Sequence, residues 1–238
     1  APVVPAYEER EITIENEVYT AVFTSHGARL KSVRLKDYPG DAGKDSPPRE
    51  MVRQGTSGQL PLEVRFEGNG TGIDDSSVFY AVEGGNRHLQ GEGDSTTLVF
   101  RGTLPNGIPI AKTFSFSAQS YGMGLEVQAE GVPQNISQLS LVWIRGVNPG
   151  QSTTNYYSTD GPVALLGRKF IYETESDLEE KETVGPGQIR WAGYSDSYFL
   201  AAMMPPEGDN YTSVFNIVNE TVRTVLTIPW NGEAVPYL

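Results

Sequence analysis

Apolar and polar residues alternate in many short stretches of the chain, and this pattern predicts β-strands rather than helices. The clearest case is segment 60–67, where four apolar residues alternate with partners that are mostly polar, as expected of a half-buried strand. Similar patterns indicate about fifteen strands in all and no long helical period. The further predicted strands include residues 11–14, 78–82, 96–101, 108–116, 121–130, 169–174, 188–194, 197–204, 211–218 and 221–228.

Residues 17–37 predict a bent hairpin. His26 and Gly27 lie where the chain must reverse, and glycine accepts the positive φ that such turns often need. After the turn the apolar set includes Leu30 and then continues from Val33, one residue out of phase. Because one extra residue turns the following side chains to the other face of a strand, this slip predicts a β-bulge.

Segment 137–145 is apolar on both faces near its centre, which predicts a strand in the middle of a sheet. Residues 161–167 and 176–182 are each predicted to hold a helical turn or two. Ser176 is the expected N-cap of the second, with Glu179 placed for a capping box. The fold class is therefore all-β. We expect one large antiparallel sandwich over residues 10–238, preceded by a linker at residues 1–9.

Composition narrows the range of functions. The 26 glycines and 16 prolines are typical of a chain with many strands joined by turns. A net charge of −12 argues against nucleic acid and against binding flat on an anionic membrane. The chain has no cysteine, which excludes disulfides, thiol nucleophiles and Cys-based metal sites. No apolar run approaches the roughly 20 residues that span a bilayer.

Candidate catalytic residues are scarce. The only histidines, His26 and His88, lie in a turn and in a polar segment, so they suggest neither a triad nor a three-histidine zinc site. We predict no catalytic residue, no metal site and no cofactor.

Three residues form a candidate platform for a peptide or another partner. Arg145 ends the apolar strand 137–145, and Arg190 stands next to Trp191 in a later strand. Exposed tryptophan and arginine together provide a flat face with a cationic group. The alternative is that the tryptophan is part of the core and the arginines extend outward to solvent.

Three stretches resemble the large periplasmic domain of the Oxa/YidC/Alb family of bacterial membrane protein insertases. The most specific is Trp191-Ala192-Gly193-Tyr194-Ser195-Asp196-Ser197-Tyr198-Phe199, similar to a family stretch with tryptophan, glycine, aspartate and Tyr-Phe at this spacing. The others are the hairpin, with Tyr19-x-Ala21-x-Phe23 and Ser25-His26-Gly27-Ala28, and Lys112-Thr113-Phe114-Ser115-Phe116 followed by Tyr121.

The resemblance implies a β-supersandwich similar to galactose mutarotase, at the periplasmic face of the bacterial inner membrane. It also implies a place between the first and second transmembrane helices of an insertase, with the piece ending before the next transmembrane segment. The expected role is a non-catalytic interaction domain that assists membrane protein insertion and folding, with or without the Sec translocon. Expected partners are the translocon subunits SecD and SecF and nascent membrane proteins. The alternative function is a mutarotase-like carbohydrate-binding or aldose-epimerising domain, which would need a histidine acid and a carboxylate base.

Overall fold

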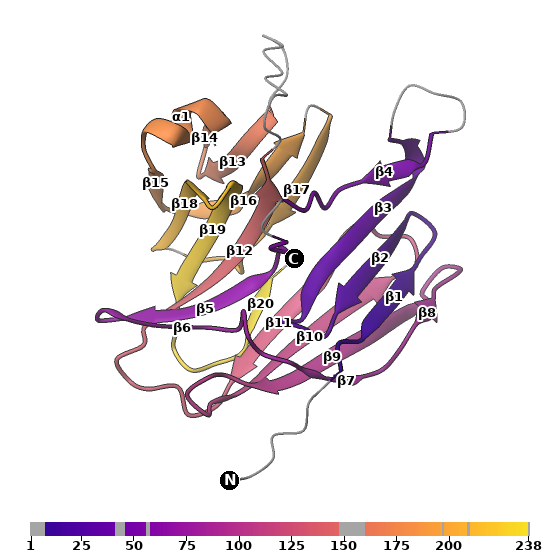
Figure 1. The fold of residues 1–238 in the computed structure, drawn as a ribbon, viewed down its shortest axis with the longest axis horizontal. Coiled ribbons are helices and arrows are strands. Elements are labelled where there is room, and N and C mark those ends of the chain that lie inside the picture. The colour runs from indigo at the N-terminus through magenta and orange to yellow at the C-terminus, as the bar shows by residue number, and fades with distance from the viewer. Residues whose placement is uncertain are drawn as a thin grey trace.

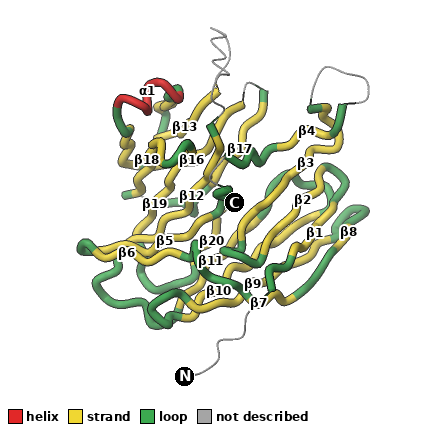
Figure 2. Tube along the Cα trace, in the orientation of Figure 1, coloured by secondary structure: helices red, strands yellow, loops and turns green. Residues whose placement is uncertain are grey.

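The structure is a computed structural model that describes residues 8–40, 46–55, 58–147, 160–196, 198–208 and 210–237. Within these ranges the regular elements are strands and one short helix, α1 (Glu175–Glu180) (Figure 2). The predicted all-β class is confirmed. None of the described helical residues forms a helix long and apolar enough to cross a membrane.

Two sheets of five strands pack face to face at one end of the molecule (Figure 1). The first has the order β4 (Pro48–Glu50), β3 (Arg29–Pro39), β2 (Tyr19–Thr24), β1 (Glu11–Glu15), β8 (Arg87–His88). The second has the order β20 (Val235–Tyr237), β11 (Gly124–Ala129), β10 (Pro109–Ser117), β9 (Ser95–Thr103), β7 (Ala81–Glu83). Phe23 joins the two layers, because its ring centroid lies 4.8 Å from that of Phe114 and 5.7 Å from that of Phe116.

Two further sheets pack together at the other end. The third has the order β15 (Thr183–Gly187), β18 (Tyr211–Val218), β19 (Thr221–Pro229), β12 (Gln138–Gly146), β5 (Glu63–Gly68), β6 (Thr71–Asp74). The fourth has the order β14 (Lys169–Tyr172), β13 (Asp160–Leu166), β16 (Ile189–Asp196), β17 (Phe199–Met203). The Thr224 hydroxyl on β19 donates to the carbonyl of Gly193 on β16 across 3.0 Å. One buried apolar cluster runs through both ends, from Ile12 to Tyr237.

The bent hairpin is confirmed as β2 and β3. Val22 pairs with Ser32 and Phe23 pairs with Leu30, so Lys31 is the extra residue of a β-bulge. Gly27 has a φ of +71° in the turn. The prediction for segment 137–145 is also confirmed, since β12 lies between β19 and β5 in the six-stranded sheet.

Two local predictions were wrong. Residues 161–167 are mostly strand β13, because pairing with β14 and β16 on both sides buries Val163 and Ala164. The N-cap of α1 is Thr174 rather than Ser176. The Thr174 hydroxyl accepts from the Asp177 backbone N–H, and the Asp177 carboxylate accepts from the Thr174 N–H, which completes a capping box two residues earlier than expected.

A cluster of buried charges joins the first three sheets. The Asp75 carboxylate is fully buried and accepts hydrogen bonds from Arg29 (2.8 Å) and from the hydroxyl of Tyr80 (3.1 Å). It also pairs with the buried Lys112 ammonium at 2.5 Å. Lys112 donates in turn to the backbone carbonyls of Gly27 and Leu62. These contacts attach the β2–β3 turn and the start of β5 to β10.

Candidate binding groove

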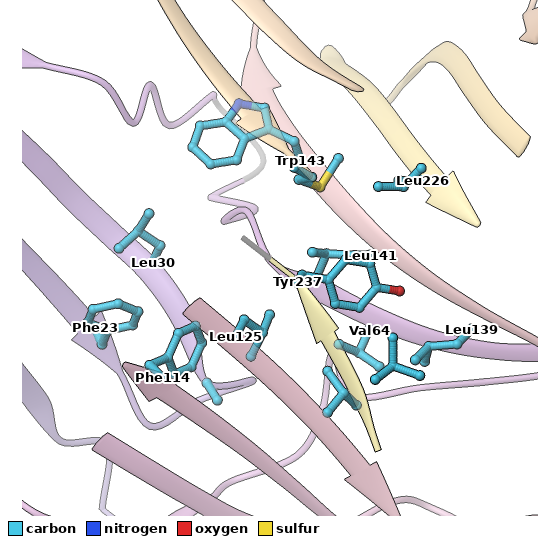
Figure 3. Close-up of a cluster of buried hydrophobic side chains, with 14 of the residues drawn as sticks. Phe23, Leu30, Val64, Phe114, Leu125, Leu139, Leu141, Trp143, Leu226 and Tyr237 are labelled. Carbon is cyan, nitrogen blue, oxygen red and sulfur yellow. The ribbon is translucent and has the colours of Figure 1, made fainter. Parts of the chain in front are cut away.

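An apolar groove of about 750 Å³ lies between the two ends of the molecule. This volume lies within the range of sites that bind small molecules and cofactors. Figure 3 shows Leu30 and Phe114 on one side of a cluster of buried apolar residues, with Leu141 and Tyr237 together on the other side. The lining residues are Tyr19, Leu30, Val33, Leu35, Tyr38, Met51, Leu62, Phe114, Tyr121, Gly122, Met123, Leu125, Leu141, Trp143, Tyr198, Phe199, Leu200, Ala201, Ala202, Met203, Met204 and Tyr237.

The chemistry of the groove is uniform. Among the described lining residues there is no Asp, Glu, Lys, Arg or His, so the side-chain polar groups are tyrosine hydroxyls and the indole N–H of Trp143. The hydroxyls of Tyr19 and Tyr237 are buried and have no hydrogen-bond partner within the described residues. Burial raises the pKa of both phenols well above the usual value, so both are neutral donors at physiological pH. The groove therefore suits an uncharged occupant that brings some hydrogen-bonding capacity.

Strand β17 forms one wall of the groove, and all five of its residues belong to the lining. It is an end strand of its sheet, paired on one side with β16 (Figure 1). The rim around it carries large exposed side chains, with Tyr198 95% and Leu200 48% exposed. Tyr38 and Tyr121 stand exposed on the rim formed by the first two sheets. Exposed apolar groups gathered around a groove are typical of an interaction site.

A clasp of side chains joins the β3–β4 arm to the β16–β17 hairpin at the groove. Arg49 on β4 forms an ion pair with Asp196 at the end of β16. Its guanidinium also lies 5.3 Å from the ring centroid of Phe199, against which Tyr38 packs edge-on at 5.2 Å. Arg145 on β12 donates to the same Asp196 carboxylate at 2.7 Å. Asp196 thus connects three strands that are distant in sequence.

We expect the Asp196→Asn variant to lose about 2 kcal/mol of unfolding free energy at pH 7, because charge-assisted bonds from two arginines are weakened. Burial opposes the ionised form of Asp196, but Arg145 and then Arg49 outweigh it, so the pKa is lowered. The stabilisation by Asp196 is therefore complete above about pH 3.9, the pKa of an Asp side chain in the unfolded chain. It is lost as the pH falls through the lower pKa of Asp196 in the folded chain.

Urea denaturation at pH 7 and pH 3 measures this effect. The difference in unfolding free energy between the parent chain and Asp196→Asn should be smaller at pH 3 than at pH 7. The control is Glu92→Gln, which changes an exposed residue. Its unfolding free energy should equal that of the parent chain at both pH values. If Asp196→Asn lost the same unfolding free energy at pH 3 as at pH 7, the clasp would not depend on the charge of Asp196.

The structure separates Arg145 from the other two residues of the predicted platform. Arg145 is only 4% exposed, and its guanidinium packs 4.4 Å from the ring centroid of Tyr194. Arg190 is exposed, and Trp191 is half-buried with its ring centroid 6.1 Å from that of Phe170. Side chains alternate along β16, so Trp191 lies on the face opposite to Tyr194 and Asp196. The structure therefore does not bring Arg145 together with Trp191.

Sequence reasoning missed the groove itself. The run from Tyr198 to Met204 was interpreted only as a strand, although it holds no charged residue and ends in two methionines. That combination is a usable signal, because methionine is common at adaptable binding surfaces. The lining residues from β2, β10 and β12 carry no such signal, since their pattern is that of ordinary core strands.

The two histidines lie outside the groove. His26 stacks on Phe79 with ring centroids 4.4 Å apart, and the Nδ1 atom of His88 lies 3.3 Å from the Glu15 carboxylate. Within the described residues, no group of three or more His, Asp or Glu side chains is arranged to hold a metal ion.

In a comparison with known families, residues 11–234 match the YidC periplasmic domain. The protein "Membrane protein insertase YidC" of Syntrophus aciditrophicus (strain SB) is 31% identical over 206 residues, which are 86% of this chain and 37% of the relative. The protein of the same name from Geotalea daltonii is 27% identical over 197 residues, 82% of this chain and 36% of the relative. The chain thus spans little more than a third of the length of these relatives.

Among solved structures, a galactose mutarotase-like protein from Lactobacillus casei superposes with a TM-score of 0.51 at 9% sequence identity. The superposition covers 96% of this chain and 98% of that one. At this sequence identity the likeness is evidence for the fold alone. It confirms the predicted supersandwich of the galactose mutarotase type.

Proposed function

Because the chain belongs to the family of YidC periplasmic domains, we propose that it is the non-catalytic interaction domain of its insertase and that its groove binds apolar segments of membrane proteins. Membership of the family places the domain at the periplasmic face of the bacterial inner membrane. We further propose that residues 10–238 act as a single domain, in keeping with the continuous core from Ile12 to Tyr237.

The observation that carries this proposal is the lining of the groove. Membrane protein segments are rich in uncharged apolar residues, and burying their side chains in the groove removes apolar surface from water. A charged or strongly polar groove would oppose such binding, since desolvating its groups without new partners is costly. The flexible methionines Met51, Met123, Met203 and Met204 let one groove adapt to different apolar sequences.

We expect a fluorescein-labelled, uncharged peptide with a Val-Leu-Val-Leu-Val core and Gly-Ser flanks to bind this chain with a Kd on the order of 10 µM. A peptide of the same length made of Ser, Asn and Gly should not bind. Fluorescence anisotropy measures both. The Leu200→Glu variant places a charge on the rim and should weaken binding at least about tenfold.

The matched control is Val184→Glu, which changes an equally exposed apolar residue on β15, away from the groove. Its affinity should equal that of the parent chain. Failure of the apolar peptide to bind, or an equal loss in both variants, would rule out the groove as the site.

The alternative function, carbohydrate binding or aldose epimerisation, has only the fold likeness in its favour. The described lining of the groove supplies no histidine and no carboxylate to act as acid and base. Sugars also need several polar partners for their hydroxyl groups. Anomer exchange catalysed by this chain, and lost in His26→Ala or His88→Ala, would favour the alternative.

SecD and SecF, the translocon accessory subunits, are proposed partners on the strength of the family resemblance. We also retain Arg190 and Trp191, next to Phe170, as a proposed second contact surface, with Arg145 acting inside the protein through Asp196. Binding of the periplasmic parts of SecD or SecF that is weakened by Trp191→Ala and not by Val184→Glu would support this surface.

A further inference from the structure

We infer that the groove receives its occupant as an extended strand, which adds to the free edge of β17 and continues the fourth sheet. The inference rests on the proposed function and specifies the conformation and chemistry of the bound segment. The segment is uncharged, about five residues long and non-helical, because β17 itself offers five residues of edge.

The first argument is the edge itself. Residues of β17 pair with β16 from Asp196–Phe199 to Ala192–Met203, and no described strand pairs with the other side. In such a strand, alternate N–H and C=O groups point away from the partner and remain available. Both faces of β17 line the groove, with Phe199, Ala201 and Met203 on one face and Leu200 and Ala202 on the other.

The second argument is that β17 lacks the protection found on the other sheet edges. Exposed edges are normally blunted by proline or by charged side chains, which discourage another strand from pairing. The four described sheets have two end strands each, and only β17, with the sequence Phe-Leu-Ala-Ala-Met, has neither device. The protecting residues on the other seven end strands are Pro48, Arg87, Pro236, Glu83, Pro186, Asp74 and Lys169.

The third argument is hydrogen-bonding capacity in an otherwise apolar site. The buried hydroxyls of Tyr19 and Tyr237, both from lining residues, have no partner in the part of the chain that the structure describes. An acyl chain or detergent tail fills apolar space but leaves the edge of β17 without hydrogen bonds. A helix satisfies its own backbone and is about 10–12 Å wide with its side chains. An extended peptide brings free N–H and C=O groups along its whole length.

The test compares two labelled peptides with the same side chains. One is the Val-Leu-Val-Leu-Val probe, and the other carries N-methyl groups on its central amides, which removes the donors on both edges of the strand. We expect the methylated peptide to bind at least about tenfold more weakly. The unmethylated peptide should lose a similar factor in Leu200→Glu and none in Val184→Glu. Isotope-edited infrared spectra of the bound peptide should show β-strand absorption.

The outcomes separate this inference from the proposed function. Equal binding of both peptides would overturn strand addition and leave the groove as a binding site. No binding of either peptide would overturn both. If analytical ultracentrifugation showed a dimer that the Leu200→Glu substitution abolished, the occupant of the β17 edge would be a second copy of the chain. If a longer form of the protein failed to bind the apolar peptide while this chain bound it, the edge of β17 would be occupied by another segment of the same protein.

Discussion

Replacing Asp75 by alanine is expected to lower the free energy of unfolding by about 3–5 kcal/mol, because it leaves buried cations without their main partner. Arg29 and Lys112 both pair with this carboxylate, and the nearest other carboxylate oxygen, on Glu63, lies 3.9 Å from Arg29. The Tyr80 hydroxyl and the Val64 N–H also lose their acceptor. Urea denaturation followed by circular dichroism at pH 7 measures the loss.

Asp74→Ala is the matched control, because among the described residues this neighbouring and partly exposed carboxylate accepts hydrogen bonds from Ser76 alone. It should cost no more than about 1 kcal/mol. Burial lowers the pKa of Lys112 to about 8, with partial compensation from Asp75, so removing both charges leaves no unpaired ammonium at this position in the core. The double variant Asp75→Ala with Lys112→Met should therefore cost less than the sum of the single changes. Additive losses would show that the two residues do not act together.

Replacing Gly193 by valine is expected to destroy the groove wall. A Cβ atom at this position would lie 1.9 Å from the carbonyl oxygen of Ala201 on β17, and a backbone atom cannot move aside as a flexible side chain can. The two strands must separate, at a cost of about 1–3 kcal/mol or more. Since β17 lines the groove over its whole length, we expect loss of binding of the apolar peptide, measured by anisotropy.

Gly85→Val is the control for this change, because a Cβ atom there would meet no atom within 4 Å. It should retain both stability and binding. Full binding by a folded Gly193→Val variant would show that the position of β17 is unimportant for the site. The same contact gives a physical reason for glycine two residues after Trp191 in the most specific stretch of the family resemblance.

The pattern of apolar residues predicted most of the fold because strand faces are set locally. The bulge at Lys31 follows from a one-residue slip, and the central place of β12 follows from its two apolar faces. Strand β13 was missed because only its neighbours β14 and β16 make residues 161–166 extended. Tertiary pairing overrides local preference at such positions.

The charged cluster and the groove could not be predicted for a different reason. Arg29 alternates with apolar residues, so the pattern assigns it to the surface, whereas Lys112 falls on the apolar face of its strand with Ile110 and Phe114. Asp75, remote in sequence, pairs with both cations, and both are buried. Arg145 was expected near a surface platform, and its partner Asp196 lies 51 residues later. The groove collects residues from seven strands, so no single segment contains its signature.

The pairing of β20 with β11 joins the last described strand to a sheet formed much earlier in the sequence. Val235 pairs with Val127 and Tyr237 with Leu125, so the last described strand completes a sheet built mainly from residues 81–129. A chain emerging from its amino end therefore has an incomplete first sandwich until its final strand arrives. Long-range closure of this kind slows folding and prolongs exposure of apolar surface. Until β20 is in place, the core residues that pack against Val235 and Tyr237 lack part of their cover.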